Sequence, residues 1–187
     1  MKKERKNNKV MKVVKGNLFD MEVDCIAITI NGFYTIQNEA VMGRGVAKQA
    51  KDKWPFIQKK LGYLLSLHGP HVNIILRKSK KNGRVYNVVG FPVKPKSGIS
   101  TGKNVVRGLK RRFPVGSSVP GFMMKASLKL IERSARELVI LSKAQGWKTI
   151  ALPKPGCGAG ELDWKSVRAV IKPILRGSKF IVVDMED

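Results

Sequence analysis

Residues 153–164 read Pro153-Lys154-Pro155-Gly156-Cys157-Gly158-Ala159-Gly160-Glu161-Leu162-Asp163-Trp164. The run before them, Thr149 to Leu152, is short and apolar, which is typical of a buried strand. From Trp164 to Ile171 apolar residues recur at helical spacing, with Asp163 in the position of an N-cap. Glycines between a strand and a helix leave backbone N–H groups open to an anion. The stretch therefore predicts a loop that holds a diphosphate, or, more simply, a tight turn that needs positive φ angles.

A second glycine loop favours the first interpretation. The apolar run Cys25 to Ile30 ends at Asn31-Gly32, and Val41-Met42-Gly43-Arg44-Gly45-Val46-Ala47 then opens an apparent helix. Two such loops in one small chain suggest a ligand with more than one phosphate, or with sugar and phosphate together. Neither loop is a Walker A motif. The nearest approach, Gly98 to Asn104, has three residues between its glycines instead of four and lacks the Ser/Thr after the lysine.

The composition limits the number of domains and the kind of partner that the protein can have. The chain has 187 residues, 43% of them hydrophobic, which suits one α/β domain with a core and is too short for two ordinary domains. Its 37 Lys and Arg against 13 Asp and Glu give a formal net charge of +24, so we expect a polyanionic partner, with nucleic acid first. Basic residues gather in 1–15 and in 95–122, although a terminal basic run is more often a solvated tail.

The cysteines and histidines argue against a disulfide framework and a metal site. Cys25 lies in an apolar strand and Cys157 in the glycine loop, a usage that fits a reducing cytosol. The two histidines, His68 and His71, lie in a turn-like sequence, so we expect no metal and no cofactor. No run approaches the roughly 20 apolar residues of a membrane span, and no signal peptide is evident. These features predict a cytoplasmic protein without a membrane partner.

The remaining patterns predict an α/β fold. Strand patterns cover 10–15, 25–30, 71–76, 84–89, 149–152 and 180–183, and helical patterns cover 46–53, 56–65, 124–138 and 164–175. Lys81-Asn82-Gly83 predicts a hairpin turn between the third and fourth strands. In the stretch 95–122 apolar residues follow neither the helical nor the strand spacing, which indicates a functional loop or a partly disordered insertion. We therefore expect a basic tail (1–9) and one domain (10–187) with a mixed sheet covered by helices on both faces.

Together these residues resemble a macro domain, the module that binds ADP-ribose and in many members hydrolyses it from a target. The resemblance covers roughly residues 10–184, and the Leu152 to Trp164 motif is its most specific part. The chain is similar to the bacterial and phage branch related to the DNA ADP-ribosyl glycohydrolase antitoxins, through the Gly43 loop and Phe91-Pro92-Val93-Lys94. The resemblance implies a three-layer α/β/α fold with a mixed central sheet and a basic loop insertion at about 95–122.

The resemblance also implies where the ligand lies. The adenine would lie beside Asn17 and Leu18, the distal ribose beside Asn31, and the diphosphate on the Gly156 to Gly160 loop. The implied ligand-binding residues are Asn17, Leu18, Asn31, Gly43, Arg44, Gly45, Val46, Gly156, Cys157, Gly158, Ala159 and Gly160. Many macro domains have an aspartate where this chain has Asn17, whose amide oxygen can still accept a hydrogen bond. By residue type alone, Asn31 is equally a strand-end turn residue.

Lys94 and Asn31 are the catalytic residues that the resemblance implies. A lysine at a strand end can act as a general base, or as a nucleophile on the opened distal ribose, when burial or neighbouring cations lower its pKa. A lysine taken at random from so basic a chain is, however, usually solvated. Related protein-directed hydrolases have an aspartate where this chain has Gly160; Glu161 or Asp163 could substitute, but Asp163 is better explained as a helix cap. The resemblance thus favours a target other than a protein glutamate.

The sequence predicts a monomeric macro domain that binds ADP-ribose and hydrolyses it from a modified macromolecule, with nucleic acid favoured by the charge. Three alternatives remain open. The chain could be a non-catalytic ADP-ribose reader, a phosphatase acting on ADP-ribose 1″-phosphate, or a basic nucleic-acid-binding module, because the fold alone does not determine function.

Overall fold

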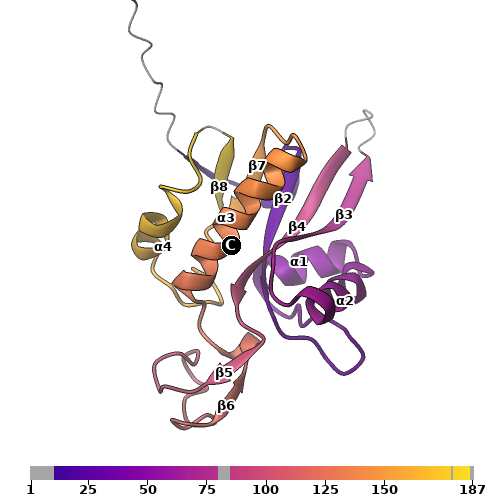
Figure 1. Cartoon of the computed structure of the whole chain (residues 1–187). Coiled ribbons are helices and arrows are strands. Elements are labelled where there is room, and N and C mark those ends of the chain that lie inside the picture. The colour runs from indigo at the N-terminus through magenta and orange to yellow at the C-terminus, as the bar shows by residue number, and fades with distance from the viewer. Residues whose placement is uncertain (1–10, 80–84, 178, 186–187) are drawn as a thin grey trace, which may run out of the picture.

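The centre of the protein is a six-stranded mixed sheet. The computed structural model describes residues 11–79, 85–177 and 179–185 (Figure 1). The strand order is β1-β8-β7-β2-β4-β3, and all neighbours run parallel except the antiparallel pair β3 and β4. The strands are β1 (Lys12–Lys15), β2 (Cys25–Asn31), β3 (Asn73–Ser79), β4 (Val85–Lys94), β7 (Ile150–Pro153) and β8 (Phe180–Asp184). The carboxyl ends of the parallel strands therefore share one edge of the sheet, which is where open α/β sheets bind ligands.

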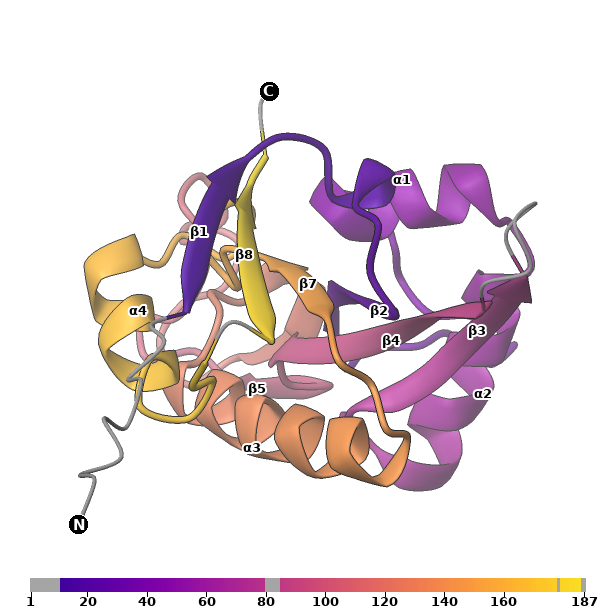
Figure 2. The ribbon, with the colours of Figure 1, turned by 90° about the horizontal axis from the view of Figure 1, so that it is seen from above.

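Helices cover both faces of this sheet (Figure 2). On one face lie α1 (Gly45–Lys53) and α2 (Ile57–His68), and on the other lie α3 (Leu128–Ala144) and α4 (Trp164–Ile171). Strand β2 is buried on both sides: Ile26 and Ile28 pack in the core with α1 and α2, while Ala27 packs in the core with α3 and α4. A near-continuous apolar strand is what such a position requires. The predicted three-layer α/β/α architecture with a mixed sheet is confirmed.

All four predicted helices differ in their boundaries from the observed helices, and two of the differences have a local cause. The apolar stripe assigned from residue 124 becomes helical only at Leu128, because Ser127 caps the helix and accepts a hydrogen bond from the N–H of Leu130 (3.3 Å). Met124 lies before the cap. The helix predicted over 164–175 ends at Ile171, where Pro173 follows without an N–H to continue the hydrogen-bond ladder. The predicted turn at 81–83 and the basic tail at 1–9 lie outside the described residues.

The stretch without a sequence period forms a small lobe that projects from the carboxyl end of β4 (Figure 1). In this β5–β6 lobe (residues 95–124), β5 (Ser97–Ile99) pairs with β6 (Ser118–Pro120), and a 3₁₀ turn, η2 (Gly121–Met123), follows. Val105, Val119 and Met124 form its own hydrophobic cluster. Strands of three residues are too short to show an alternating pattern. A Cβ on Gly121 would lie 1.7 Å from the carbonyl oxygen of Pro95, so closure of the lobe requires glycine there.

No helix in the described part of the chain is long and apolar enough to cross a membrane.

Candidate functional site

A cavity of about 970 Å³ opens at the carboxyl edge of the sheet. The ends of β2, β4, β7 and β8 line it, together with the loops that follow β2 and β7. The predicted site residues that line it are Asn31, Gly43, Arg44, Gly45, Val46, Lys94, Gly156, Cys157, Gly158, Ala159 and Gly160. A second hollow of about 760 Å³, between α3 and α4, contains none of them. The fold thus brings two glycine loops that are far apart in the sequence to one cavity.

The glycines of the β7–α4 loop (residues 154–163) have different roles: some are required by a tight turn, and one is open to a ligand. A Cβ on Gly160 would lie 2.5 Å from the carbonyl oxygen of Gly156, and Gly156 has a φ of +75°, so both glycines are required by the turn itself. The N–H of Leu162 closes this turn by donating to the carbonyl oxygen of Gly156 (3.0 Å). Gly158 is different, because it is exposed and an added Cβ would meet no atom within 4 Å. Its backbone is free to be approached by a ligand.

The β2–α1 loop (residues 41–45) is positioned by Asn31. The side-chain Nδ2 of Asn31 donates to the carbonyl oxygen of Val41 (2.8 Å), and Oδ1 accepts from the N–H of Phe33 (2.9 Å). Asn31 therefore performs the strand-end turn role that its residue type suggests, while it also lines the cavity. Gly45, with a φ of +56°, begins α1, so the first N–H groups of this helix lie beside the cavity.

Lys94 is buried at the end of β4, where it pairs with Asn31 across the sheet. Only 6% of the residue is exposed, so the solvated-lysine alternative does not hold. Its Nζ donates to the carbonyl oxygens of Ala159 (2.8 Å) and Phe122 (3.4 Å). Burial first, and then the positive charge of Arg44, lower the pKa of Lys94 to about 8, although Glu161 acts in the opposite direction. A substantial share of this amine is therefore neutral near pH 8, as a base or nucleophile must be.

The two carboxylates near the glycine loop have structural partners. Asp163 caps α4 by accepting from the N–H groups of Lys165 and Ser166 (2.9 Å each), as the sequence predicts. The hydroxyl of Ser166, followed by these N–H groups, lowers the pKa of Asp163. Glu161 accepts from the N–H of Arg107 (2.8 Å) and forms an ion pair with Lys125 (3.4 Å). Neither carboxylate lines the cavity, and Glu161 fastens the lobe to the β7–α4 loop.

Asn17 and Leu18 do not line the cavity, unlike the other predicted site residues. Asn17 is exposed and caps the 3₁₀ turn η1 (Leu18–Asp20), its Oδ1 accepting from the N–H of Phe19 (2.9 Å). The side chain of Leu18 is fully buried in the core, and its N–H donates to the Sδ of Met185 (3.2 Å). The chain turns into η1 directly after Gly16, which directs both side chains elsewhere.

Sequence reasoning missed residues at both ends of the cavity. The lobe contributes an apolar wall beside Lys94, made of Val106, Leu109, Phe122 and Met123. Lys154, Trp164, Asp184 and Met185 line the other side. The strand-end rule could have indicated Asp184, because it directly follows the last predicted strand (180–183). The lobe residues carry no comparable signal, since only the packing of the lobe directs them toward the cavity.

Cys157 also lines the cavity, and burial raises the pKa of its thiol to about 11. A thiol that stays protonated at neutral pH is a poor nucleophile. Among the described residues, no group of three or more His, Cys, Asp or Glu side chains could hold a metal ion.

No protein-family profile matches the chain, and no curated protein matches it in sequence. Solved structures do match. The macrodomain of Mycobacterium tuberculosis DarG superposes with a TM-score of 0.66 at 16% identity, over 93% of this chain and 98% of that chain. The macrodomain of Thermus aquaticus DarG gives 0.63 at 22% identity, over 94% and 98%. Thermosipho africanus DarTG in complex with ADP-ribose gives 0.64 at 20% identity, over 94% of this chain and 43% of that longer chain.

Proposed function

Because the chain has the macro-domain fold, we propose that its cavity binds ADP-ribose and that Lys94 helps to remove ADP-ribose from a modified nucleic acid. One observation carries this proposal: two glycine loops and a buried lysine of lowered pKa face the same cavity. Exposed N–H groups at Gly158 and at the start of α1 suit the diphosphate. The similar T. africanus structure contains ADP-ribose, which supports the choice of ligand.

Lys94 can serve the hydrolysis in two ways. As a general base, its neutral amine takes a proton from water while the water oxygen bonds to the anomeric carbon; the bond to the target breaks, and the target leaves with the electron pair and gains a proton. As a nucleophile, the amine displaces the target from the ring-opened distal ribose, and water then hydrolyses the imine to ADP-ribose and free lysine. Both routes need the neutral amine.

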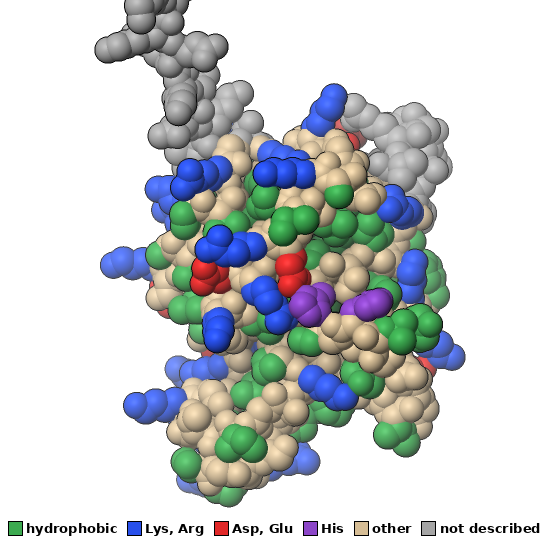
Figure 3. Space-filling model, viewed as in Figure 1, with side chains coloured by type: hydrophobic (Ala, Val, Ile, Leu, Met, Phe, Trp, Pro, Cys, Tyr) green, Lys and Arg blue, Asp and Glu red, His purple; other side chains and the backbone are tan. Residues whose placement is uncertain are grey.

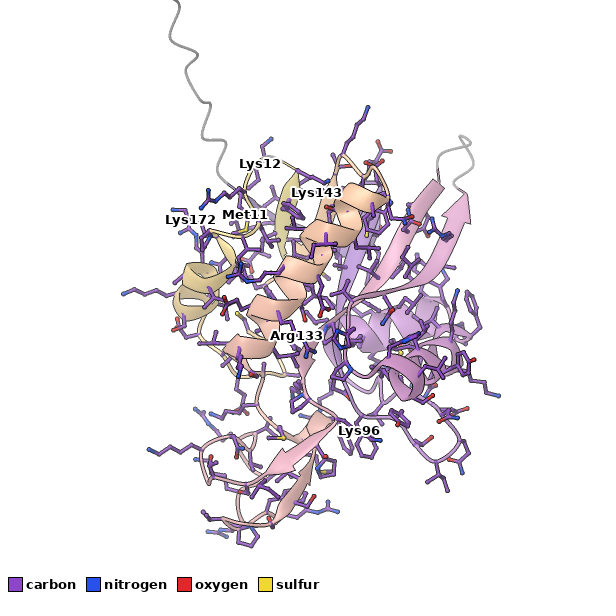
Figure 4. All side chains as sticks on the ribbon, in the orientation of Figure 1. Met11, Lys12, Lys96, Arg133, Lys143 and Lys172 are labelled. Carbon is purple, nitrogen blue, oxygen red and sulfur yellow. The ribbon has the colours of Figure 1, made fainter. Side chains whose placement is uncertain are left out.

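The lobe favours a nucleic-acid target. Its apolar wall beside Lys94, which includes Leu109 and Phe122, suits the flat face of a nucleobase better than a carboxylate. The lobe also carries exposed basic residues, Lys96, Lys103, Arg107, Lys110, Arg111 and Arg112. Lys and Arg side chains are also scattered over the face that Figure 3 shows, and Lys96 lies where the lobe joins the body (Figure 4). Such cations bind phosphates without reading the base sequence.

The direct test is to incubate the protein with ADP-ribosylated DNA, RNA and protein and to quantify the ADP-ribose released. We propose release from nucleic acid. Release of ADP-ribose from the protein substrate alone would contradict the proposal that the target is a nucleic acid. Binding of ADP-ribose without release from any substrate would instead support the reader alternative.

Replacing Gly158 with valine is expected to weaken ADP-ribose binding by roughly tenfold, about 1.4 kcal/mol. The free protein has room for the new side chain, since nothing lies within 4 Å of the added Cβ, so the loss would come from blocking the approach of the diphosphate. Calorimetry measures the affinity, and thermal unfolding checks that the variant is folded. An unchanged affinity in the folded variant would exclude the β7–α4 loop as the diphosphate site.

The pH dependence of kcat/KM is expected to rise through about pH 8 and then level off, because only neutral Lys94 is active and its pKa is lowered to about 8. In Arg44→Gln the cation that helps to lower this pKa is absent, so the rise should shift to higher pH. Initial rates at low substrate concentration, taken from pH 6 to 10, measure both curves. A pH-independent rate, or a shift to lower pH in the variant, would contradict this role.

A further inference from the structure

The cavity extends to the carboxyl end of β8, on the side away from Lys94. Strands β8, β7, β2 and β4 are consecutive in the sheet and parallel. Adjacent strands lie about 4.8 Å apart, so the end of β8 is roughly 14 Å from the end of β4 along the sheet edge. The β7–α4 loop leaves the sheet between them. A ligand with its distal ribose at Lys94 and its diphosphate on this loop therefore directs its base toward β8.

The β8 end of the cavity combines a charged pair with apolar side chains. Asp184 Oδ2 lies 2.6 Å from the Nζ of Lys154, and the two side chains are 39% and 25% exposed, so a ligand can reach both. The Lys154 Nζ also lies 5.7 Å from the ring centroid of Trp164. Trp164 and Met185 line the same end. Apolar side chains beside one carboxylate are what a flat base with an amino group requires.

Asn17 is the residue that was expected to lie beside the adenine. Its side chain lies outside the cavity lining, and its Oδ1 already accepts from the N–H of Phe19. The carboxylate of Asp184 does line the cavity, and the N–H of Gly16 donates to the carbonyl oxygen of the same residue (3.1 Å). The end of β8, which neighbours β1 in the sheet, therefore presents a carboxylate to the cavity, and the turn after β1 presents no side chain to it.

We propose that Asp184 accepts a hydrogen bond from the exocyclic amino group of the bound purine and so selects adenine. This inference rests on the proposed binding of ADP-ribose. Lys154, which also lines the cavity, forms an ion pair with this carboxylate. A 6-keto base presents an oxygen to the carboxylate instead of a donor, so it meets repulsion and leaves the carboxylate without that hydrogen bond.

Calorimetric titration with ADP-ribose and with inosine diphosphate ribose tests the assignment, because the two ligands differ at the 6-position of the base. The wild type is expected to prefer ADP-ribose by at least about tenfold. In Asp184→Asn the preference should fall below about threefold, because the amide Nδ2 can donate to the 6-keto oxygen. The matched control Asn17→Ala should keep the wild-type preference.

The outcomes separate the inference from the function on which it rests. If the wild type binds neither ligand, both fail. If it binds both ligands equally, if Asp184→Asn keeps the wild-type preference, or if Asn17→Ala loses it, Asp184 is not the residue that selects adenine, although ADP-ribose binding stands. Thermal unfolding of each variant excludes a trivial loss of fold.

Discussion

Replacing Lys94 with alanine is expected to lower turnover of ADP-ribosylated nucleic acid by roughly 10²–10⁴-fold, the usual effect of losing a positioned proton-transfer group. ADP-ribose affinity should change little, because the glycine loops remain. The carbonyl oxygens of Ala159 and Phe122, which lose their donor, can be hydrated in the space that the side chain vacates. Single-turnover release of ADP-ribose, beside calorimetry with free ADP-ribose, separates the two effects.

Two further variants sharpen this result. Lys94→Arg should also be inactive, because a guanidinium stays protonated at neutral pH and cannot serve as base or nucleophile. Lys48→Ala, which removes an exposed lysine of α1 that forms an ion pair with Asp52 (2.6 Å), should keep wild-type turnover. Full activity in Lys94→Ala would refute the catalytic role of Lys94 and leave the cavity as a binding site.

Neutralising the lobe is expected to produce the second large effect. The triple variant of Lys110, Arg111 and Arg112 to glutamine should flatten the plot of log affinity against log salt by up to about 0.9 per lost phosphate contact on duplex DNA. All three side chains are exposed, so the fold should not change. The three residues follow Val106 and Leu109 in the sequence, and both of these line the cavity. A nucleic-acid strand bound by the three basic residues would therefore run past the end of the cavity where Lys94 lies.

A matched triple variant separates the lobe from the general charge of the chain. Lys12, Lys143 and Lys172 are exposed and lie at the opposite end of the molecule from the lobe (Figure 4). Their replacement by glutamine removes the same charge, yet it should leave the salt dependence of oligonucleotide binding close to that of the wild type. Affinity for free ADP-ribose should be unchanged in both triples. Equal losses in both would mean that the binding reflects net charge rather than a site on the lobe.

Local sequence patterns were sufficient for the layers of the fold. The apolar run of β2 predicts a strand buried on both faces, and Ile26 and Ala27 indeed pack in opposite cores. The cap role of Asp163 was also predictable, since its partners are the next residues along the helix. In each case residues close together in the sequence are sufficient for the prediction, because the spacing of apolar residues along a strand or helix indicates which of its faces is buried.

The tertiary structure alone decided the distribution of roles within the site. Burial of Lys94 depends on the lobe and on the β7–α4 loop, both distant in the sequence, and this burial lowers its pKa. Glu161 is engaged because Arg107 of the lobe meets it, and Asn17 lies outside the cavity because the chain turns into η1. Asp184 enters the cavity because β8 neighbours β7 in the sheet. Strand order and the packing of the lobe depend on contacts between residues that are far apart in the sequence. The local spacing of residue types therefore cannot predict them.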